Sequence, residues 1–250
     1  MSAFWAGFCA IYRRELGNYL ATPLAYVFVA AFLAAASLSA FQLGGLFEAM
    51  RADMQIYFQF HPWLYVFFMP ALAMRTWTEE GQSGTLETLL SLPVPAAALV
   101  LGKFGASWSI AAITLVLSTP LWIALSWLGP VDHGVTLLSY LASFLLAGAC
   151  LAIGMAMSAA SRSQVVAFVL GAGICFVLIA AGLPVVSETL AGFVGSEAAR
   201  AVTALSLLDP FDGMTRGVLE ARAVVYFALT TASWLGVTLV LVDAKRRAGG

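Results

Sequence analysis

The chain has 250 residues, of which 62% are hydrophobic and 10% are charged, and its formal net charge is −1. A typical soluble domain carries about 25% charged residues, so this composition excludes an ordinary soluble protein and predicts an all-α, polytopic membrane protein. The sequence has no basic patch of the kind that binds nucleic acid, so we expect no nucleic-acid partner.

Residues 1–22 predict an amphipathic helix that lies in the plane of the lipid headgroups. Aromatic and apolar side chains occupy one face and arginines the other, which suits a helix at the membrane–water interface. The residues expected at this interface are Trp5, Tyr12, Arg13, Arg14 and Tyr19. Thr22-Pro23 should end the helix and turn the chain into the bilayer.

Six apolar runs predict six transmembrane helices, because each comes close to the about 20 residues that a hydrocarbon core of roughly 30 Å requires. The expected spans are residues 24–44, 57–74, 96–127, 135–158, 165–184 and 223–242. The second run reaches this length only if the span begins in the aromatic residues 57–60. Pro120 should kink the third span, and Lys103 near its start should extend its ammonium toward the interface.

The fourth and fifth spans carry small residues at four-residue spacing, which permits close packing of helices. They are Gly148, Ala152 and Ala156 on the fourth span, and Gly171 and Cys175 on the fifth. This pattern suits contacts inside one helix bundle or between two copies, and we favour the first.

Cysteine and histidine do not indicate a metal centre. Cys9, Cys150 and Cys175 lie in or beside apolar runs at no metal-ligand spacing. His61 and His133 stand far apart near expected helix ends. We therefore expect the cysteines to behave as small apolar residues, with no metal and no cofactor bound by this chain.

Lysine and arginine positions predict the orientation in the membrane. With six spans both termini share one side, which holds Arg13, Arg14, Arg75, Lys103, Arg162, Lys245, Arg246 and Arg247, whereas the other side holds Arg51, Arg200, Arg216 and Arg222. We therefore expect both termini to be cytoplasmic. The polar segment 185–222 should face outward, with apolar patches at 190–194 and 201–208 that are too short to span but could enter the membrane edge as half-helices.

Residues 75–93, called the elbow below, form a charged connection between the second and third expected spans. The preceding helix should run on through Arg75 and Trp77. Gly81 and Gly84 should then break it, because glycine tolerates the positive φ of a sharp bend.

A short second helix is expected in the elbow. Ser83 or Thr85 can cap it, and Glu87 lies in its first turn, where the helix dipole favours an anion. Its apolar face consists of Leu86, Leu89 and Leu90. Such an elbow could be a binding site for a soluble partner, or an interfacial loop whose leucines contact lipid headgroups. The residues alone do not decide between these two interpretations.

The elbow resembles the connection between the second and third helices of ABC-2 type transporter permeases. The matching stretches are residues 77–80, 84–90 with Pro93, and 100–104. The starts of the interfacial helix and first span, at 13–16 and 23–27, are similar to the same family. Residues 44–47 and 62–64, and Phe211 with residues 216–222, are similar to the branch that includes gliding-motility permeases and nitrous-oxide-reductase copper-maturation permeases.

The resemblance implies that the elbow is a coupling helix that docks on a separate cytoplasmic ABC ATPase subunit. The coupling residues would be Trp77, Glu79, Glu80, Gly84, Thr85, Leu86, Glu87, Leu89 and Leu90. Two ATPases and two permeases, the second a further copy or a related chain, would assemble among the lipids of a bacterial plasma (inner) membrane. ATP and Mg would bind the ATPases, since this chain has no Gly-x-x-x-x-Gly-Lys-[Ser/Thr] phosphate loop and is not expected to be an enzyme.

The resemblance also covers an extracytoplasmic motif to which the sequence assigns no role: Phe211, Arg216, Gly217 and Glu220.

The expected function is an exporter-type permease. The alternative is a mechanical transmitter that passes ATP-driven motion to a periplasmic accessory protein without moving a solute. The nearly uncharged spans fit amphiphilic cargo or mechanical work better than an ion pathway. An intramembrane enzyme is disfavoured, because neither His61 nor His133 is placed to complete a metal site with Glu79 and Glu80.

Overall fold

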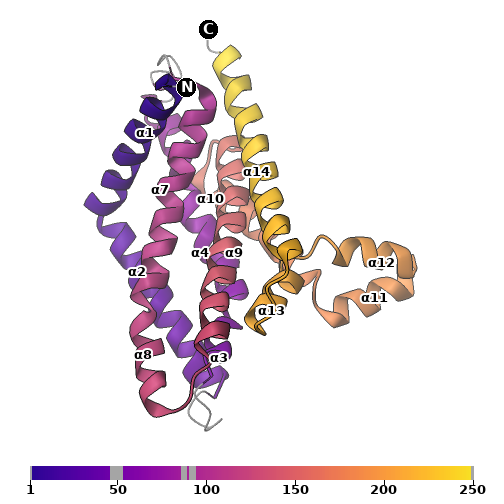
Figure 1. The fold of residues 1–250 in the computed structure, drawn as a ribbon. Coiled ribbons are helices and arrows are strands. Elements are labelled where there is room, and N and C mark those ends of the chain that lie inside the picture. The colour runs from indigo at the N-terminus through magenta and orange to yellow at the C-terminus, as the bar shows by residue number, and fades with distance from the viewer. Residues whose placement is uncertain (1, 46–52, 86–88, 90–93, 249–250) are drawn as a thin grey trace.

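The computed structural model describes residues 2–45, 53–85, 89 and 94–248. Helices make up 85% of these described residues and no strand occurs among them, so the all-α prediction is confirmed. Most helices pack into one elongated bundle, from which α11 (Pro184–Val194) and α12 (Ser196–Thr203) project as an arm (Figure 1).

The first elements are α1 (Ser2–Ala21), α2 (Pro23–Leu38) and a π-helical turn, η1 (Ser39–Leu43). The predicted corner at Thr22-Pro23 is confirmed: Thr22 is extended, with φ −98° and ψ 129°, and Pro23 occupies the first turn of α2. A proline fits there because the first N–H groups of a helix have no partner within the helix. At this corner α1 leans away from α2 and lies along α7 (Ala96–Leu117).

Glycine lets α1 approach α7 closely. A Cβ atom at Gly102 would lie 2.9 Å from Cγ2 of Ile11. The hydroxyls of Tyr12 and Ser109 are hydrogen-bonded at 2.8 Å, and Tyr19 also contacts α7 through its hydroxyl. Two of the aromatic residues expected at the headgroups therefore hold α1 against the bundle.

The next segment consists of three short helices in succession, α3 (Gln55–Phe58), α4 (His61–Ala73) and α5 (Arg75–Gln82). Helical structure begins before His61, as predicted for the second span. Met74 alone separates α4 from α5, so the helical course continues into the elbow.

The third segment is interrupted just before Pro120. α7 ends at Leu117, Ser118 follows, and Pro120 occupies the first turn of α8 (Thr119–Leu128). The predicted disturbance is confirmed, because proline lacks a backbone donor and its ring crowds the preceding turn.

The remaining helices are α9 (His133–Ala160), α10 (Gln164–Ala180), α13 (Leu208–Thr215) and α14 (Ala221–Ala248), with α11 and α12 between α10 and α13. α9 is the central helix and packs against α4, α7, α10, α13 and α14. Its first turn is capped by Asp132, whose carboxylate accepts hydrogen bonds from Gly134 N–H at 2.9 Å and Val135 N–H at 3.1 Å. Such a cap supplies partners for otherwise unpaired donors.

Small residues hold α9 close to its neighbours. A Cβ atom at Gly148 would lie 3.0 Å from Nε1 of Trp108, and one at Gly171 would lie 3.3 Å from Cα of Gly154 and 3.2 Å from Cβ of Pro70. Ala152, Ala156 and Cys175 are also buried within the chain. The prediction of packing inside the bundle is confirmed.

Among the described residues, four helical segments are long and apolar enough to cross a membrane: Ala25–Leu43, Ala96–Leu128, His133–Ala160 and Ala221–Arg247. α10 and α11 form a fifth if they are one span, although the chain bends by 84° between them. α4 has only 13 residues, so the prediction of six spans is not confirmed.

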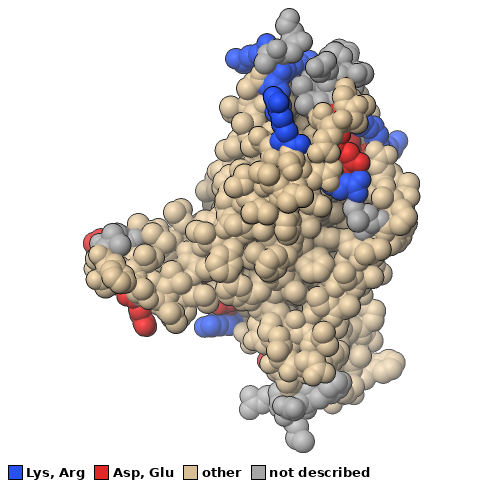
Figure 2. All heavy atoms as spheres, turned by 180° about the vertical axis from the view of Figure 1, so that it is seen from behind, with Lys and Arg blue, Asp and Glu red and all other residues tan. Residues whose placement is uncertain are grey.

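The two termini lie at the same end of the bundle (Figure 1), and Figure 2 shows Lys and Arg gathered at that end of the visible face.

Candidate functional site

The elbow is fastened to the bundle where it begins. The hydroxyl oxygen of Ser158, near the end of α9, accepts hydrogen bonds from the backbone N–H groups of Trp77 at 3.1 Å and Thr78 at 3.3 Å. The same hydroxyl donates to the carbonyl of Met74 at 2.8 Å. A side chain from another helix thus caps the start of α5, where backbone donors would otherwise lack partners.

The first helix of the elbow ends at one of the two predicted glycines. Gly84 has φ +72°, the left-handed conformation that favours glycine. Gly81 instead lies inside α5, so the prediction that it breaks the helix is wrong. Hydrogen bonds along α5 continue to Ser83, whose N–H donates to the carbonyl of Glu79 at 2.9 Å.

The predicted second helix of the elbow lies largely outside the described residues, and so do Leu86, Glu87 and Leu90. Of its predicted apolar face, Leu89 is described and is buried. Thr85 is exposed, and its hydroxyl is 2.8 Å from that of Ser83.

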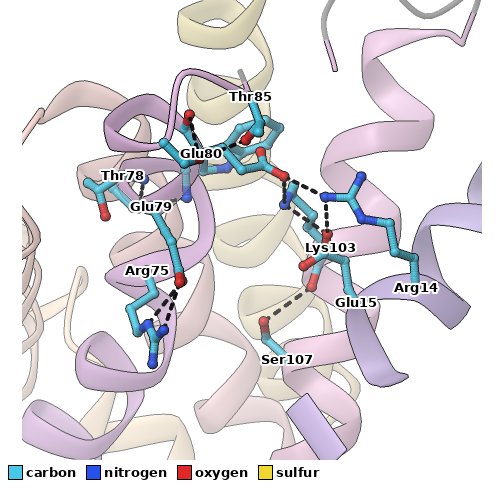
Figure 3. A network of polar contacts seen from close by, with 12 residues as sticks. Arg14, Glu15, Arg75, Thr78, Glu79, Glu80, Thr85, Lys103 and Ser107 are labelled. Atoms are coloured by element: carbon cyan, nitrogen blue, oxygen red, sulfur yellow. Dashed lines mark hydrogen bonds and ion pairs between the residues drawn. The ribbon is translucent and has the colours of Figure 1, made fainter. Parts of the chain in front are cut away.

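Glu80 is the centre of a buried ionic network that joins three helices (Figure 3). Its Oε1 atom accepts hydrogen bonds from Lys103 of α7 at 2.9 Å and from Arg14 of α1 at 3.0 Å. Lys103 also donates to Glu15 of α1 at 3.1 Å. Burial of charge is tolerated when each ion has an opposite partner, and here two ammonium or guanidinium groups face two carboxylates.

The Lys103 side chain is buried within the protein, so the prediction that its ammonium extends outward is wrong. Its side chain is 2% exposed, and its Nζ atom lies 5.3 Å from the ring centroid of Trp77. The reason is local: Glu15 and Glu80 supply carboxylates inside the protein, so the lysine needs no water to satisfy its charge. A lysine within an apolar run indicates that a carboxylate lies close to it inside the protein. That pattern could have predicted a partner for Lys103, but it did not identify Glu15.

Glu79, the neighbour of Glu80, points the other way. It forms a two-point ion pair with Arg75, at 3.0 Å to Nε and 2.8 Å to Nη2, and its side chain is 52% exposed. The hydrogen bond to Glu79 raises the pKa of Arg75. The predicted coupling residues therefore fall into two sets, because Glu79 and Thr85 are accessible whereas Trp77 and Glu80 are buried inside the chain.

The motif that the sequence predicts to be extracytoplasmic lies around α13 and has a structural explanation. Phe211 is fully buried, and Arg216 and Glu220 are exposed. Gly217 has φ +88°, and a Cβ atom there would lie 2.9 Å from Cγ2 of Val135 at the start of α9. Phe211 and Gly217 thus place α13 against the bundle. Asp212 lies between these two residues in the sequence. Burial raises the pKa of its carboxyl group, and the positive charge of the nearby Arg216 opposes that shift.

His61 is buried in an aromatic cluster and is not near the elbow. Its Nδ1 atom is 2.6 Å from the hydroxyl of Ser143, which is also 2.6 Å from the hydroxyl of Tyr65. The rings of Phe32 and Phe58 pack edge-on against it. Among the described residues, no group of three His, Cys, Asp or Glu side chains could hold a metal ion.

Residues 24–242 match the family described as ABC-2 family transporter protein. No curated protein matches the chain.

Proposed function

The chain belongs to the ABC-2 transporter family, as a non-catalytic, multi-pass membrane component, and we propose that it is an exporter-type permease driven through its elbow by a separate ABC ATPase. In this proposal two permeases and two ATPases form the transporter. The termini and the elbow face the cytoplasm of a bacterial cell, and α2, α4, α7–α8, α9, α10 and α14 supply the six spans. The basic residues around the shared end of the termini support this orientation.

The attachment of the elbow to the bundle carries the proposal. Ser158 ties the start of α5 to α9, and Glu80 ties its end to α1 and α7. A contact can pass motion to membrane helices only if it is stiff and if the two states differ in contact energy. A force applied to α5 would move three other helices with it.

The accessible face of the elbow provides the surface for a partner. Glu79 and Thr85 are exposed there, and Gln82 donates to the carbonyl of Arg162 at 3.1 Å, which brings the α9–α10 turn beside the elbow. Charged groups at the rim of an interface set orientation and association rate, whereas apolar groups supply most of the affinity. We propose that Glu79 is a rim contact and that Leu86 and Leu90 form the apolar part, whereas Leu89 is buried within the chain.

The arm favours a second function, mechanical transmission to a periplasmic protein. α11 and α12 project from the bundle rather than packing on it (Figure 1), and Val185 and Phe193 are 72% and 87% exposed. An arm with exposed apolar groups suits a further contact with membrane or protein. Retention of a periplasmic protein that is lost when α11 and α12 are deleted would support this function over solute export.

The experiment that tests coupling is purification of the tagged chain from native membranes in mild detergent, with identification of each co-purifying protein. We expect a stoichiometric chain with a phosphate-binding loop. Glu79→Arg should reduce its recovery, whereas the matched reversal Glu197→Arg on the arm should not. Recovery of the permease without any such ATPase, under conditions that keep other ABC complexes intact, would contradict the proposal.

A further inference from the structure

A cleft of about 560 Å³ opens between the α1–α2 corner on one side and α4–α5 on the other. This volume lies within the range of sites that bind small organic ligands. One part of its wall is charged and the other is apolar. The charged part consists of Arg14, Glu15, Arg75, Glu79, Glu80 and Lys103.

The apolar part of the cleft belongs to helices that continue into the membrane. Val27, Phe28 and Ala31 of α2 line it, together with Ala71 of α4. Val27 is 63% exposed and Ala31 is exposed too, so this wall is not closed by protein among the described residues. The charged part adjoins the Thr22-Pro23 corner, where α1 gives way to a membrane-crossing helix. A ligand that fills the whole cleft must be polar at the corner and apolar toward the bilayer.

The charges in the cleft differ in what they can still bind. Lys103 and Glu80 are buried and Glu15 is half-buried, and Lys103 pairs with both carboxylates. Arg14 and Arg75, whose side chains are 47% and 33% exposed, retain accessible guanidinium groups. Figure 3 shows these two arginines on opposite sides of Glu80. A guanidinium fork matches the oxygens of a phosphate, so phosphate is the anion that this pair suits.

The cleft also offers acceptors for a cation. The Glu79 carboxylate is 52% exposed, and the hydroxyls of Ser83 and Thr85 line the same wall. Three basic and three acidic side chains balance, so a ligand without net charge enters at the lowest electrostatic cost. A primary ammonium can donate hydrogen bonds to these oxygens, whereas a trimethylammonium has no N–H group.

From this geometry we propose that the cleft binds one zwitterionic phospholipid with a primary ammonium, of the phosphatidylethanolamine type. Its phosphate binds Arg14 and Arg75, its ammonium binds Glu79, and its acyl chains lie along α2 and Ala71. The proposal does not depend on coupling to an ATPase, since all of these groups belong to this chain.

Native mass spectrometry of the full chain, purified with any bound partners and stripped of lipid, tests the proposal. Phosphatidylethanolamine, phosphatidylcholine and phosphatidylglycerol with the same acyl chains are added in turn. We expect the first to bind about tenfold more tightly than either of the others, because one charge-assisted hydrogen bond is worth about that factor. Soluble glycerophosphoethanolamine, the headgroup alone, should not displace it at equal concentration.

Two variants act on opposite parts of the cleft. Arg75→Gln removes the phosphate partner, and Ala31→Phe fills the apolar part. Their matched controls are Arg13→Gln, an exposed arginine of α1 outside the cleft, and Ala34→Phe, an exposed alanine of α2 outside the cleft. Both cleft variants should weaken phosphatidylethanolamine binding about tenfold, and both controls should leave it unchanged.

Several results would overturn the proposal. Equal binding of the three lipids, tighter binding of phosphatidylglycerol, or displacement by the soluble headgroup would each contradict the chosen ligand. Binding unaffected by both cleft variants would place the lipid elsewhere. Because the two variants change different chemistry at different helices, misfolding of one does not remove the test. Glu79 belongs to both proposals, but Ala31 lies on α2, outside the elbow. Ala31→Phe should therefore weaken lipid binding without changing the recovery of an ATPase, so the two proposals fail separately.

Discussion

Glu80 of α5 and Lys103 of α7 are joined by an ion pair of 2.9 Å inside the bundle, although Glu79, one residue earlier, faces outward. The pair ties the elbow to a membrane-crossing helix, and Arg14 and Glu15 extend the tie to α1. The side of α5 that holds the bundle and the side that a partner could reach are therefore different sides of one helix.

Neutralising the two adjacent acids should give different losses of stability. We expect Glu80→Gln to lower the free energy of unfolding by about 3 kcal/mol, because a buried pair loses one member while Glu15 remains beside Lys103. Glu79→Gln should cost less than about 1 kcal/mol, because its pair with Arg75 is exposed. Chemical denaturation in detergent, followed by tryptophan fluorescence, measures both. Equal losses would show that Glu80 is not buried as described.

Lys103→Met should destabilise the protein by about 3–5 kcal/mol, since it leaves the buried Glu80 and the half-buried Glu15 with only the half-exposed Arg14. The double variant Lys103→Met with Glu80→Gln should lose less than the sum of the single variants, with a coupling energy of about 0.5–3 kcal/mol. The same denaturation experiment gives the full cycle. Additive losses would mean that the two side chains do not interact.

Ser158→Ala should loosen the start of the elbow. The variant removes one donor and one acceptor that together make three hydrogen bonds, and leaves buried backbone groups unpaired, for an expected loss of about 1–3 kcal/mol. Hydrogen exchange at residues 77 and 78 should rise as well. The control is Ser233→Ala on α14, an exposed serine that bonds only within its own helix, which should change stability by less than about 0.5 kcal/mol. Unchanged exchange at the elbow would contradict the role of Ser158 as its cap.

Gly217→Ala should destabilise the segment around α13 by about 1–3 kcal/mol, because alanine is strained at φ +88° and its Cβ would press on Val135. Gly213→Ala is the matched control: it lies inside α13 with open space around it, and alanine favours a helix. Thermal unfolding in detergent compares the two. A neutral Gly217→Ala would indicate that the segment can take another backbone path.

Most helix positions could be predicted because they depend on nearby residues. Pro23 and Pro120 set helix boundaries through the geometry of their own rings, and Gly84 ends α5 through its own backbone. Gly81 shows the limit of that reasoning. A glycine tolerates a bend but does not impose one, and the hydrogen bond from Ser83 to Glu79 carries the helix past it.

The candidate site could be located from the sequence, but its internal arrangement could not. The charged residues 75–80 identified the elbow. Glu15 lies 65 residues before Glu80, and nothing in the sequence indicated that both carboxylates bind Lys103. Likewise Ser158 is far from Met74 in the sequence, and its capping role exists only because α9 passes beside α5. Such contacts depend on how helices cross, which a single sequence does not specify.

By itself, the sequence determined that this protein is a helical membrane protein with a charged elbow, since apolar length and proline or glycine positions act locally. It also carried the pattern of the ABC-2 transporter family. Only the tertiary structure decided that Glu80 is buried and Glu79 is exposed. The two side chains are chemically the same and successive on one helix, so Arg14 of α1 and Lys103 of α7, which bind Glu80 and not Glu79, give them different roles.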